Sequence, residues 1–454
     1  MTETVSSPLS QKTANRVQHA RVGFALLLAC LLLLPTASWA QTDKVLYSFS
    51  GPNQDHPTIS ILAIDAKGNL YGVASGDDNG VVFELASAKN KWTESVLYTF
   101  AGGSDGAFPQ GGLVFDQAGN LYGVTQGGGD GCKGGCGTVF ELTPGQNGTW
   151  TESVLYSFRG ETDGSNPEAA LVFDAAGNLY GTTLAGGKES CQSGGCGTVF
   201  QLAPGAGGTW NETVLHSFAG GKDGYEPVGG VVIDSSGIVY GTASLGGKFG
   251  GGIVFKLTPG KKKWKETILH NFAGGSDGYL PLAGLALSEG DLYGTTYAGG
   301  NGCTVQPVRS AGTQIGVLQH DGLGNGCGTV FQMTPGAKGQ WQETPILKFS
   351  GTDGIESEAT PVLDKAGNLY VTTFEGGSGA CGVCGTALEL TPSNGTWTEI
   401  ILHDFGAESG DAGTPESGFI LNKSGNLFGT SSLGGTNNNG TVYEIKPQTR
   451  QHAP

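Results

Sequence analysis

Short bursts of apolar and β-branched residues, separated by Gly, Asn and Pro, follow one another along almost the whole chain. In a representative repeat they span residues 112–116, 120–125, 138–142 and 150–158. Bursts of this length between turn-forming residues predict β-strands. The second burst returns in related form, at residues 69–72, 120–123, 178–181, 238–241, 291–294, 368–371 and 426–429. Seven copies at a period of roughly fifty to sixty residues predict a tandem-repeat architecture.

The apolar pattern within a repeat predicts how its strands pack. The first three bursts alternate little between apolar and polar residues, as in residues 138–140, so their strands need cover on both faces. The fourth burst begins polar, as in residues 150–152, which suits the edge of a sheet. Four-stranded antiparallel sheets of this kind stack around an axis. Seven of them predict an all-β, seven-bladed β-propeller.

The two ends of the chain predict how the ring closes. Fourth bursts led by tryptophan occur six times, at Trp92, Trp150, Trp210, Trp264, Trp341 and Trp397. The seventh repeat stops after its third burst, residues 440–445, whereas a single burst of the fourth type, residues 45–49, stands near the N-terminus. We therefore expect the N-terminal strand to pair with the last blade and complete it.

The first 40 residues predict a cleaved signal peptide, because Arg16 and Arg21 precede an apolar run at 22–34 and small residues flank Trp39. A lipoprotein box around Cys30 is disfavoured, since four leucines of the apolar run follow it. The mature protein is then expected to be secreted, periplasmic or held at the cell surface, without a transmembrane segment. Residues 41–448 are expected to form one propeller domain, with a closing strand at 43–50, a tail at 449–454 and repeats near 58–101, 108–158, 167–218, 227–272, 281–349, 356–405 and 415–446.

Charge and composition exclude several classes of protein. The net charge is −16, and removal of residues 1–40 changes it to 21 − 39 = −18. A chain this acidic repels phosphate backbones, so a nucleic-acid partner is not expected. The 82 glycines argue against long helices.

The repeated segments resemble the bacterial GloVer tandem-repeat family, whose members are called choice-of-anchor proteins. The resemblance rests on recurrent Asp-x-x-Gly-Asn-Leu-Tyr-Gly-Thr-Thr, Gly-Thr-Val-Phe and Trp-Thr-Glu-x-Val-Leu-Tyr-Ser-Phe segments, and it covers residues 43–446. It implies an exported repeat protein with a variable surface anchor and no established activity. Because the sequence ends at Pro454, just past the last repeat, we expect a soluble secreted or periplasmic form.

Eight cysteines beyond Cys30 form local pairs in the loops between the second and third strands of four repeats. An even number in an exported chain predicts disulfides, here Cys132–Cys136, Cys191–Cys196, Cys303–Cys327 and Cys381–Cys384. Zinc would need two pairs to converge, but pairs about sixty residues apart lie on different blades. The Cys-x-x-Cys at 381–384 lacks the helix of a redox motif. No metal site is predicted, and no cofactor, with calcium as the one alternative.

The loops that join successive repeats carry the candidate binding residues Asp105, Asp163, Asp223, Asp277 and Asp353, each followed by glycine. These loops and the cysteine loops are expected on one face. One interpretation is a ring of carboxylates at the channel mouth that binds cations or sugar hydroxyls. The other, which five equal copies favour, is an aspartate that accepts backbone N–H groups within a turn. Phe108, Tyr225 and Tyr279 follow in the same loops, either to contact a ligand or, as we favour, to fill the gaps between blades.

No catalytic residues are predicted. Residues 102–106 and 274–278 match Gly-x-Ser-x-Gly, but that motif acts on a strand-to-helix turn, which is not expected here. His216, His270 and His403 stand where other repeats have tyrosine, so we expect them to pack between blades. The sequence predicts a binding or surface-interaction module for polysaccharide, an envelope glycan or a protein partner. The alternatives are a propeller hydrolase or lyase that uses carboxylates on the loop-bearing face, and a structural spacer.

Overall fold

A computed structural model describes residues 42–50, 60–75, 79–89, 91–188, 190–191, 194–300, 326–378 and 384–447. The chain divides into two units, Met1–Thr42 and Asp43–Pro454. The predicted signal peptide, residues 1–40, lies outside the described residues. In the part of the chain that the structure describes, no helix has the length and apolar character needed to cross a membrane.

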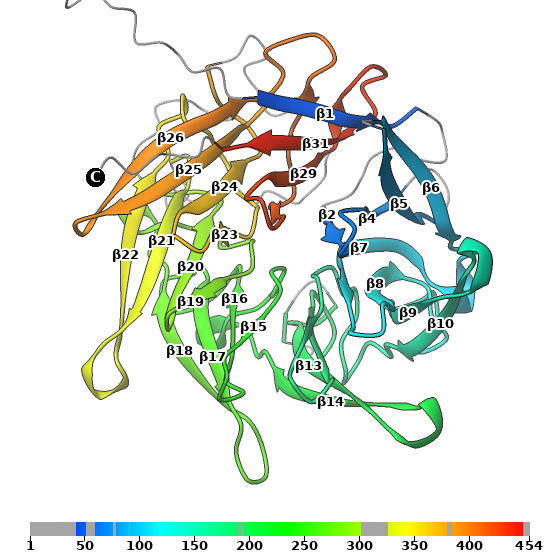
Figure 1. The fold of residues 1–454 in the computed structure, drawn as a ribbon. Coiled ribbons are helices and arrows are strands. Elements are labelled where there is room, and N and C mark those ends of the chain that lie inside the picture. Colours follow the sequence, from blue (N-terminus) through cyan, green and yellow to red (C-terminus); the bar gives the residue numbers. More distant parts are fainter. Residues whose placement is uncertain are drawn as a thin grey trace, which may run out of the picture. The chain divides into compact units, whose positions relative to one another are not determined.

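The second unit is built from seven small antiparallel sheets arranged as the blades of a propeller (Figure 1). The innermost strands are β3 (Ala63–Ile64), β7 (Ala107–Phe115), β11 (Val172–Phe173), β15 (Val232–Ile233), β19 (Ala286–Ser288), β23 (Val362–Leu363) and β28 (Ile420–Leu421). The second strands are β4 (Leu70–Ala74), β8 (Leu121–Gly127), β12 (Leu179–Thr183), β16 (Val239–Ala243), β20 (Asp291–Thr296), β24 (Leu369–Thr373) and β29 (Leu427–Ser431).

The third strands are β5 (Val81–Ala88), β9 (Thr138–Pro144), β13 (Thr198–Pro204), β17 (Ile253–Thr258), β21 (Thr329–Pro335), β25 (Thr386–Ser393) and β31 (Thr441–Lys446). The outermost strands are β6 (Lys91–Thr99), β10 (Trp150–Ser157), β14 (Trp210–Ser217), β18 (Lys265–Asn271), β22 (Trp341–Lys348), β26 (Thr396–Asp404) and, for the seventh blade, β1 (Thr42–Ser48). We number the blades 1 to 7, from the one that contains β3 to the one that contains β28.

Short elements complete the blades. Strand β2 (Ser60–Ile61) pairs in parallel with β7, and β27 (Ala412–Gly413) pairs with β30 (Leu433–Gly434). Three 3₁₀ turns lie in loops between blades, η1 (Gly103–Asp105), η4 (Gly221–Asp223) and η5 (Gly275–Asp277). Three more join the third and outermost strands of a blade, η2 (Gln146–Gly148), η3 (Ala206–Gly208) and η6 (Ala337–Gly339).

The N-terminal strand closes the ring, as the sequence predicts. Strand β1 pairs with β31 at the edge of the sheet β1-β31-β29-β28, so segments from both ends of the chain form blade 7. The backbone N–H of Phe49 donates to the carbonyl of Gly440 at 3.1 Å. Figure 1 shows β1, in blue, lying along the red β31.

The core consists of separate clusters, one between each pair of neighbouring blades. The phenylalanine that follows each outermost strand is buried. Six of the seven pack edge-on against an aromatic ring of the next blade, and the seventh, Phe349, lies in a cluster with Leu388 of blade 6. Ring centroids lie 5.1 Å apart for Phe100 and Phe140 and 5.4 Å apart for Phe49 and Phe83. Each blade therefore derives its apolar cover from its two neighbours.

Candidate functional site

The five aspartates predicted as binding residues are held within their own loops. Each accepts a backbone N–H from just after the preceding outermost strand, as Ala101 donates to Asp105 and, at 2.7 Å, Ala219 donates to Asp223. The donors to the other three, Asp163, Asp277 and Asp353, are Arg159, Ala273 and Ser350. These bonds are the ones expected of an aspartate that stabilises a turn.

Asp105, Asp163, Asp223 and Asp277 also contact a tyrosine or histidine of the preceding outermost strand, whereas the strand before Asp353 has Leu347 at that position. The hydroxyl of Tyr156 donates to Asp163 at 2.6 Å. In the next two blades histidine takes the place of tyrosine. Nε2 of His216 lies 3.3 Å from Asp223, and Nε2 of His270 lies 3.0 Å from Asp277. The histidines also pack edge-on against a phenylalanine two residues later, in line with the packing role expected from sequence.

A glutamate from the outermost strand of the next blade completes each group. We call these groups rim triads: one Tyr or His, one loop Asp, and one acidic residue of the following blade. Burial, together with the charge of the loop aspartate, raises the pKa of Glu152 and Glu212 to about 7. The same two causes raise the pKa of Glu266 and Glu343 to about 8. These raised pKa values favour the protonated form of each glutamate, which lessens the repulsion between two adjacent carboxyls.

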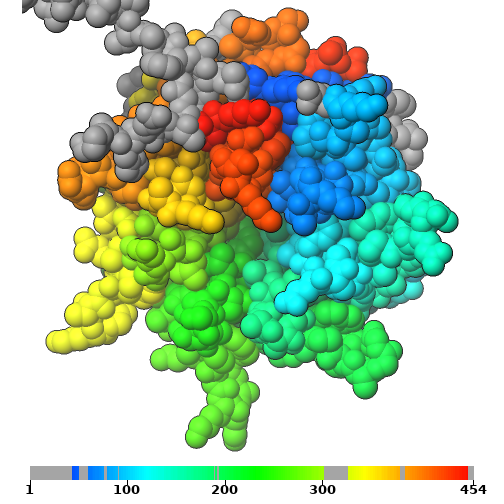
Figure 2. Space-filling model, viewed as in Figure 1, coloured from blue at the N-terminus to red at the C-terminus, as the bar shows by residue number. Residues whose placement is uncertain are grey.

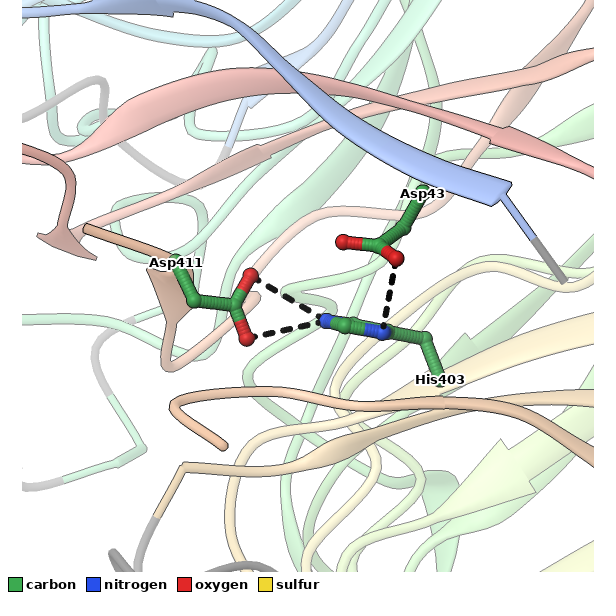
Figure 3. A group of neighbouring side chains, drawn as sticks. All are labelled: Asp43, His403 and Asp411. Carbon is green, nitrogen blue, oxygen red and sulfur yellow. Dashed lines mark hydrogen bonds and ion pairs between the residues drawn. The ribbon is translucent and has the colours of Figure 1, made fainter. Parts of the chain in front are cut away.

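The triad between blades 6 and 7 has a different arrangement (Figure 3). His403 lies between two aspartates, with Nε2 3.0 Å from Asp411 and Nδ1 3.6 Å from Asp43 of β1. Hydrogen bonding to Asp411 and the charges of both aspartates raise the pKa of His403, against the opposing effect of burial. The two aspartates therefore favour the charged form of His403, which bridges blade 6 to the closing strand.

The protonated glutamates lead us to expect a protein that loses stability as pH rises. The folded chain holds protons on Glu152 and Glu212 up to about pH 7, whereas the unfolded chain releases them near 4.5. Because the folded state binds more protons in that interval, the free energy of unfolding falls with increasing pH. The urea midpoint should decrease from about pH 5 to about pH 8 in the presence of EDTA.

The double variant Glu152→Gln/Glu212→Gln serves as the control for this pH dependence. Glutamine has nearly the shape of the protonated acid but has no proton to lose, so the decrease should be smaller. An equally steep decrease in the variant would contradict the assignment.

A second set of equivalent residues surrounds the axis. In six blades one residue has a left-handed backbone, with φ between 50° and 59°. It lies in the inner segment, which we define as the chain that leads into the innermost strand together with that strand. These residues are Phe108, Asn166, Glu226, Leu280, Glu356 and Thr414. Its N–H donates to a loop carbonyl of the preceding blade, as Glu226 donates to Cys196 at 3.0 Å. Its own carbonyl accepts from its own blade, as Glu226 accepts from Ser244. The loops that carry the left-handed residues therefore lie on the same face as the loops that supply the carbonyls. Hydrogen bonds to the preceding blade and to its own blade hold each strained backbone in place.

Two residues further on, each of these blades places a partly exposed side chain between buried neighbours. We call these the axial positions: Gln110, Glu168, Val228, Leu282, Glu358 and Glu416. The inner segments of consecutive blades touch each other there, since the N–H of Gly284 donates to the hydroxyl of Thr360 at 3.1 Å. The hydroxyl of Thr372 likewise donates to the carbonyl of Ser417 at 2.9 Å. Figure 2 shows a hollow at the centre of the face in view.

Acidic residues are concentrated in one sector of this inner region. Partial burial, with Glu416 and Glu356 close by, raises the pKa of Glu358 to about 8. Burial and the charge of Glu356 raise the pKa of Glu375 to about 7. Burial and Glu356 also raise the pKa of the Tyr297 hydroxyl. This sector therefore holds neutral carboxyl groups at pH 7, which can both donate and accept hydrogen bonds.

The three aromatic candidates divide between the two expected roles. Tyr279 is 4% exposed, and Tyr225 packs against the core cluster between blades 3 and 4. Phe108 is 44% exposed at the left-handed position of blade 2. Only Phe108 of the three is placed to contact a ligand.

The cysteines lie at the junctions between blades. The structure joins Cys132 to Cys136 and Cys191 to Cys196. Cys327 and Cys384 are also disulfide-bonded, and their predicted partners, Cys303 and Cys381, lie outside the described residues. The second cysteine of each pair supplies the carbonyl that binds the next blade's left-handed residue, as Cys136 does for Asn166 at 2.9 Å. The predicted disulfides thus fix loops that connect one blade to the next.

Several residues of these sites escaped the sequence analysis. The rim glutamates stand two residues after the leading tryptophan, from Glu94 to Glu399, and that regular spacing is a signal that could have identified them. Asp411 was missed because alanine rather than glycine follows it. The axial positions mix acidic, amide and aliphatic residues, so no motif marks them in the sequence and only the inner packing reveals them.

The family model described as "Gloeobacter/Verrucomicrobia repeat" matches the chain at residues 36–191, 190–306 and 302–453. No curated protein sequence matches the chain. Similar solved structures include virginiamycin B lyase from Staphylococcus aureus, with a TM-score of 0.49, 11% identity, and coverage of 90% of this chain and 99% of that one. A protein from Lactobacillus plantarum has a TM-score of 0.47 and 16% identity, over 79% of this chain and 86% of that one. At such identities the likeness concerns the fold alone.

Proposed function

The chain belongs to the Gloeobacter/Verrucomicrobia repeat family, and from that premise we propose that it is an exported binding module for a neutral polysaccharide or envelope glycan. We place the ligand at the axial positions. The observation that carries the proposal is the contrast between a repeated backbone and unlike side chains. Equivalent positions hold three glutamates, one glutamine and two aliphatic residues. A rigid scaffold with varied side chains on one face is suited to binding.

The chemistry of the axial positions favours a hydroxyl-rich, uncharged ligand. A protonated Glu358 donates and accepts hydrogen bonds, as each sugar hydroxyl does. The exposed ring of Phe108 offers an apolar surface on which a sugar ring can stack. The acidic chain repels anionic polymers.

The repeats themselves provide test substitutions. Glu358→Leu introduces the residue of blade 5, and Phe108→Asn introduces the residue of blade 3, which tolerates a left-handed backbone. We expect each to weaken glycan binding about tenfold, which corresponds to one lost hydrogen bond or stacking contact. Lys262→Ala, in an exposed turn at the outer edge, should bind like the wild type. Titration calorimetry with neutral and anionic polysaccharides measures this. Equal affinity of the Glu358→Leu variant and the wild type would contradict the proposal.

A second candidate is a hydrolase or lyase that acts on polymers, favoured by the proximity of Glu358 to Glu416 and Glu356. A carboxyl with a raised pKa next to other carboxyls is the arrangement of a general acid. Release of new chain ends from a bound polysaccharide would identify this activity. Glu358→Gln should then abolish release while binding persists. Absence of both binding and release would leave the structural spacer.

A further inference from the structure

Two rim triads bring one histidine nitrogen and two carboxyl groups together. They are His216, Asp223 and Glu266 between blades 3 and 4, and His270, Asp277 and Glu343 between blades 4 and 5. In each triad one ligand atom per residue lies within 4.8 Å of the other two. We propose that these two triads bind divalent zinc-class metal ions, one ion at each junction. The sequence pattern suggested cation binding only as one interpretation of the loop aspartates, with calcium as the ion, and did not predict the histidine and glutamate ligands.

The distances suit a small metal ion. Nε2 of His216 lies 3.3 Å from Asp223 and 3.9 Å from Glu266, so both carboxylates approach the same nitrogen. Ligand atoms at the corners of a zinc tetrahedron are about 3.3 Å apart, given bonds of about 2.0 Å. The side chains of His216 and His270 keep only 17% and 20% of their surface exposed, so both candidate sites are largely enclosed by protein.

Unpaired buried atoms point to the same conclusion. In the described part of the chain, Nε2 of His216, Oε1 of Glu266 and Oε1 of Glu343 are closed to solvent and lack a hydrogen bond of good geometry. Oε1 of Glu152 and Oε1 of Glu212, in the triads that contain tyrosine, are also closed to solvent and lack a hydrogen bond of good geometry. The histidine nitrogen is therefore what distinguishes the two proposed sites, because imidazole is a strong zinc ligand and a tyrosine hydroxyl that donates to aspartate is not.

Each site would offer a metal ion one imidazole nitrogen and two carboxyl oxygens. The other charged groups close by are Lys188, near Glu266, and Lys348, near Glu343.

The third histidine triad is not expected to bind. His403 directs its two nitrogens at different aspartates, Nδ1 at Asp43 and Nε2 at Asp411 (Figure 3). This group also has one ligand atom per residue within 4.8 Å of the other two, but each nitrogen is already paired with its own aspartate, so a metal ion would have to break one of these pairs.

The experiment is a calorimetric titration of zinc into the untagged protein as it is exported, with its disulfides formed. We expect two zinc ions per chain, one in His216→Tyr or His270→Tyr, and none in the double variant. Tyrosine at this position is already used in blades 1 and 2, so the variants should fold. Zinc should raise the melting temperature of the wild type and leave that of the double variant unchanged.

A variant designed to gain a zinc site provides an independent test. Tyr156→His creates a third triad of the same composition with Asp163 and Glu212, and we expect three zinc ions per chain. This variant tests the proposal even if the tyrosine variants fail to fold. No zinc bound by the wild type, two ions still bound by the double variant, or an unchanged number in Tyr156→His would each overturn the proposal.

Discussion

Removal of residues 42–50 should abolish the cooperative unfolding transition of the propeller. Strand β1 is the outermost strand of blade 7, and without it the cluster between blades 7 and 1 loses Phe49, which is 1% exposed and packs against Phe83. The bridge from Asp43 to His403 is lost as well. Since each blade depends on its neighbours for apolar cover, an open ring exposes two sheet surfaces at once.

The milder variant Phe49→Ala should lower the free energy of unfolding by about 3–5 kcal/mol, the usual cost of truncating a buried phenylalanine. Urea unfolding followed by tryptophan fluorescence measures both effects. A synthetic peptide of residues 42–50, added to the truncated protein, should restore part of the transition. A truncated protein with the wild-type midpoint would show that the ring does not need this strand.

The seven blades and their closure could be predicted because the repeat carries its packing in local sequence. The tryptophan-led bursts numbered six, and the missing seventh strand was present at residues 45–49. Pairing of this strand with the last blade is the only arrangement that gives each of the seven blades a fourth strand. The disulfide loops could be predicted for a similar reason, since each pair closes within its own repeat.

The candidate sites could not be predicted in the same way, because they are formed between repeats. A rim triad joins an outermost strand, the following loop and the next outermost strand, so Asp223 and Glu266 are 43 residues apart in sequence yet adjacent in space. The aspartates alone suggested a ring of free carboxylates. Their hydroxyl and imidazole partners depend on the angle between blades, which no pattern within one repeat specifies. The chemistry of Glu358 likewise depends on Glu416 of the neighbouring blade.

The glycine of the second strand leads to the other large expected effect. In blade 2, Gly123 pairs with Phe140 of the third strand, and a Cβ at Gly123 would lie 2.5 Å from Cζ of that ring. The same clash is present at Gly72, Gly181, Gly241 and Gly294 with the corresponding phenylalanine. Blade 6 is different, because Val371 pairs there with Leu388, and both side chains are buried. In those five blades the phenylalanine ring therefore occupies the space where a side chain on the glycine would lie. In blade 6 the side chains of valine and leucine fill the same space together.

Gly123→Val should therefore lower the free energy of unfolding by about 3 kcal/mol or more, since the ring of Phe140 is fully buried and has little room to move. Phe140→Leu alone should also destabilise, because it leaves a cavity. The double variant Gly123→Val/Phe140→Leu reproduces the pair of blade 6 and should be more stable than Gly123→Val, with a favourable coupling of about 1–3 kcal/mol. Recovery should be incomplete, since Leu113, whose methyl group would lie 2.9 Å from the new Cβ, stands where blade 6 has Pro361. Additive losses in the urea midpoints would show that the two residues do not share a volume, and that the glycine is needed for backbone reasons alone.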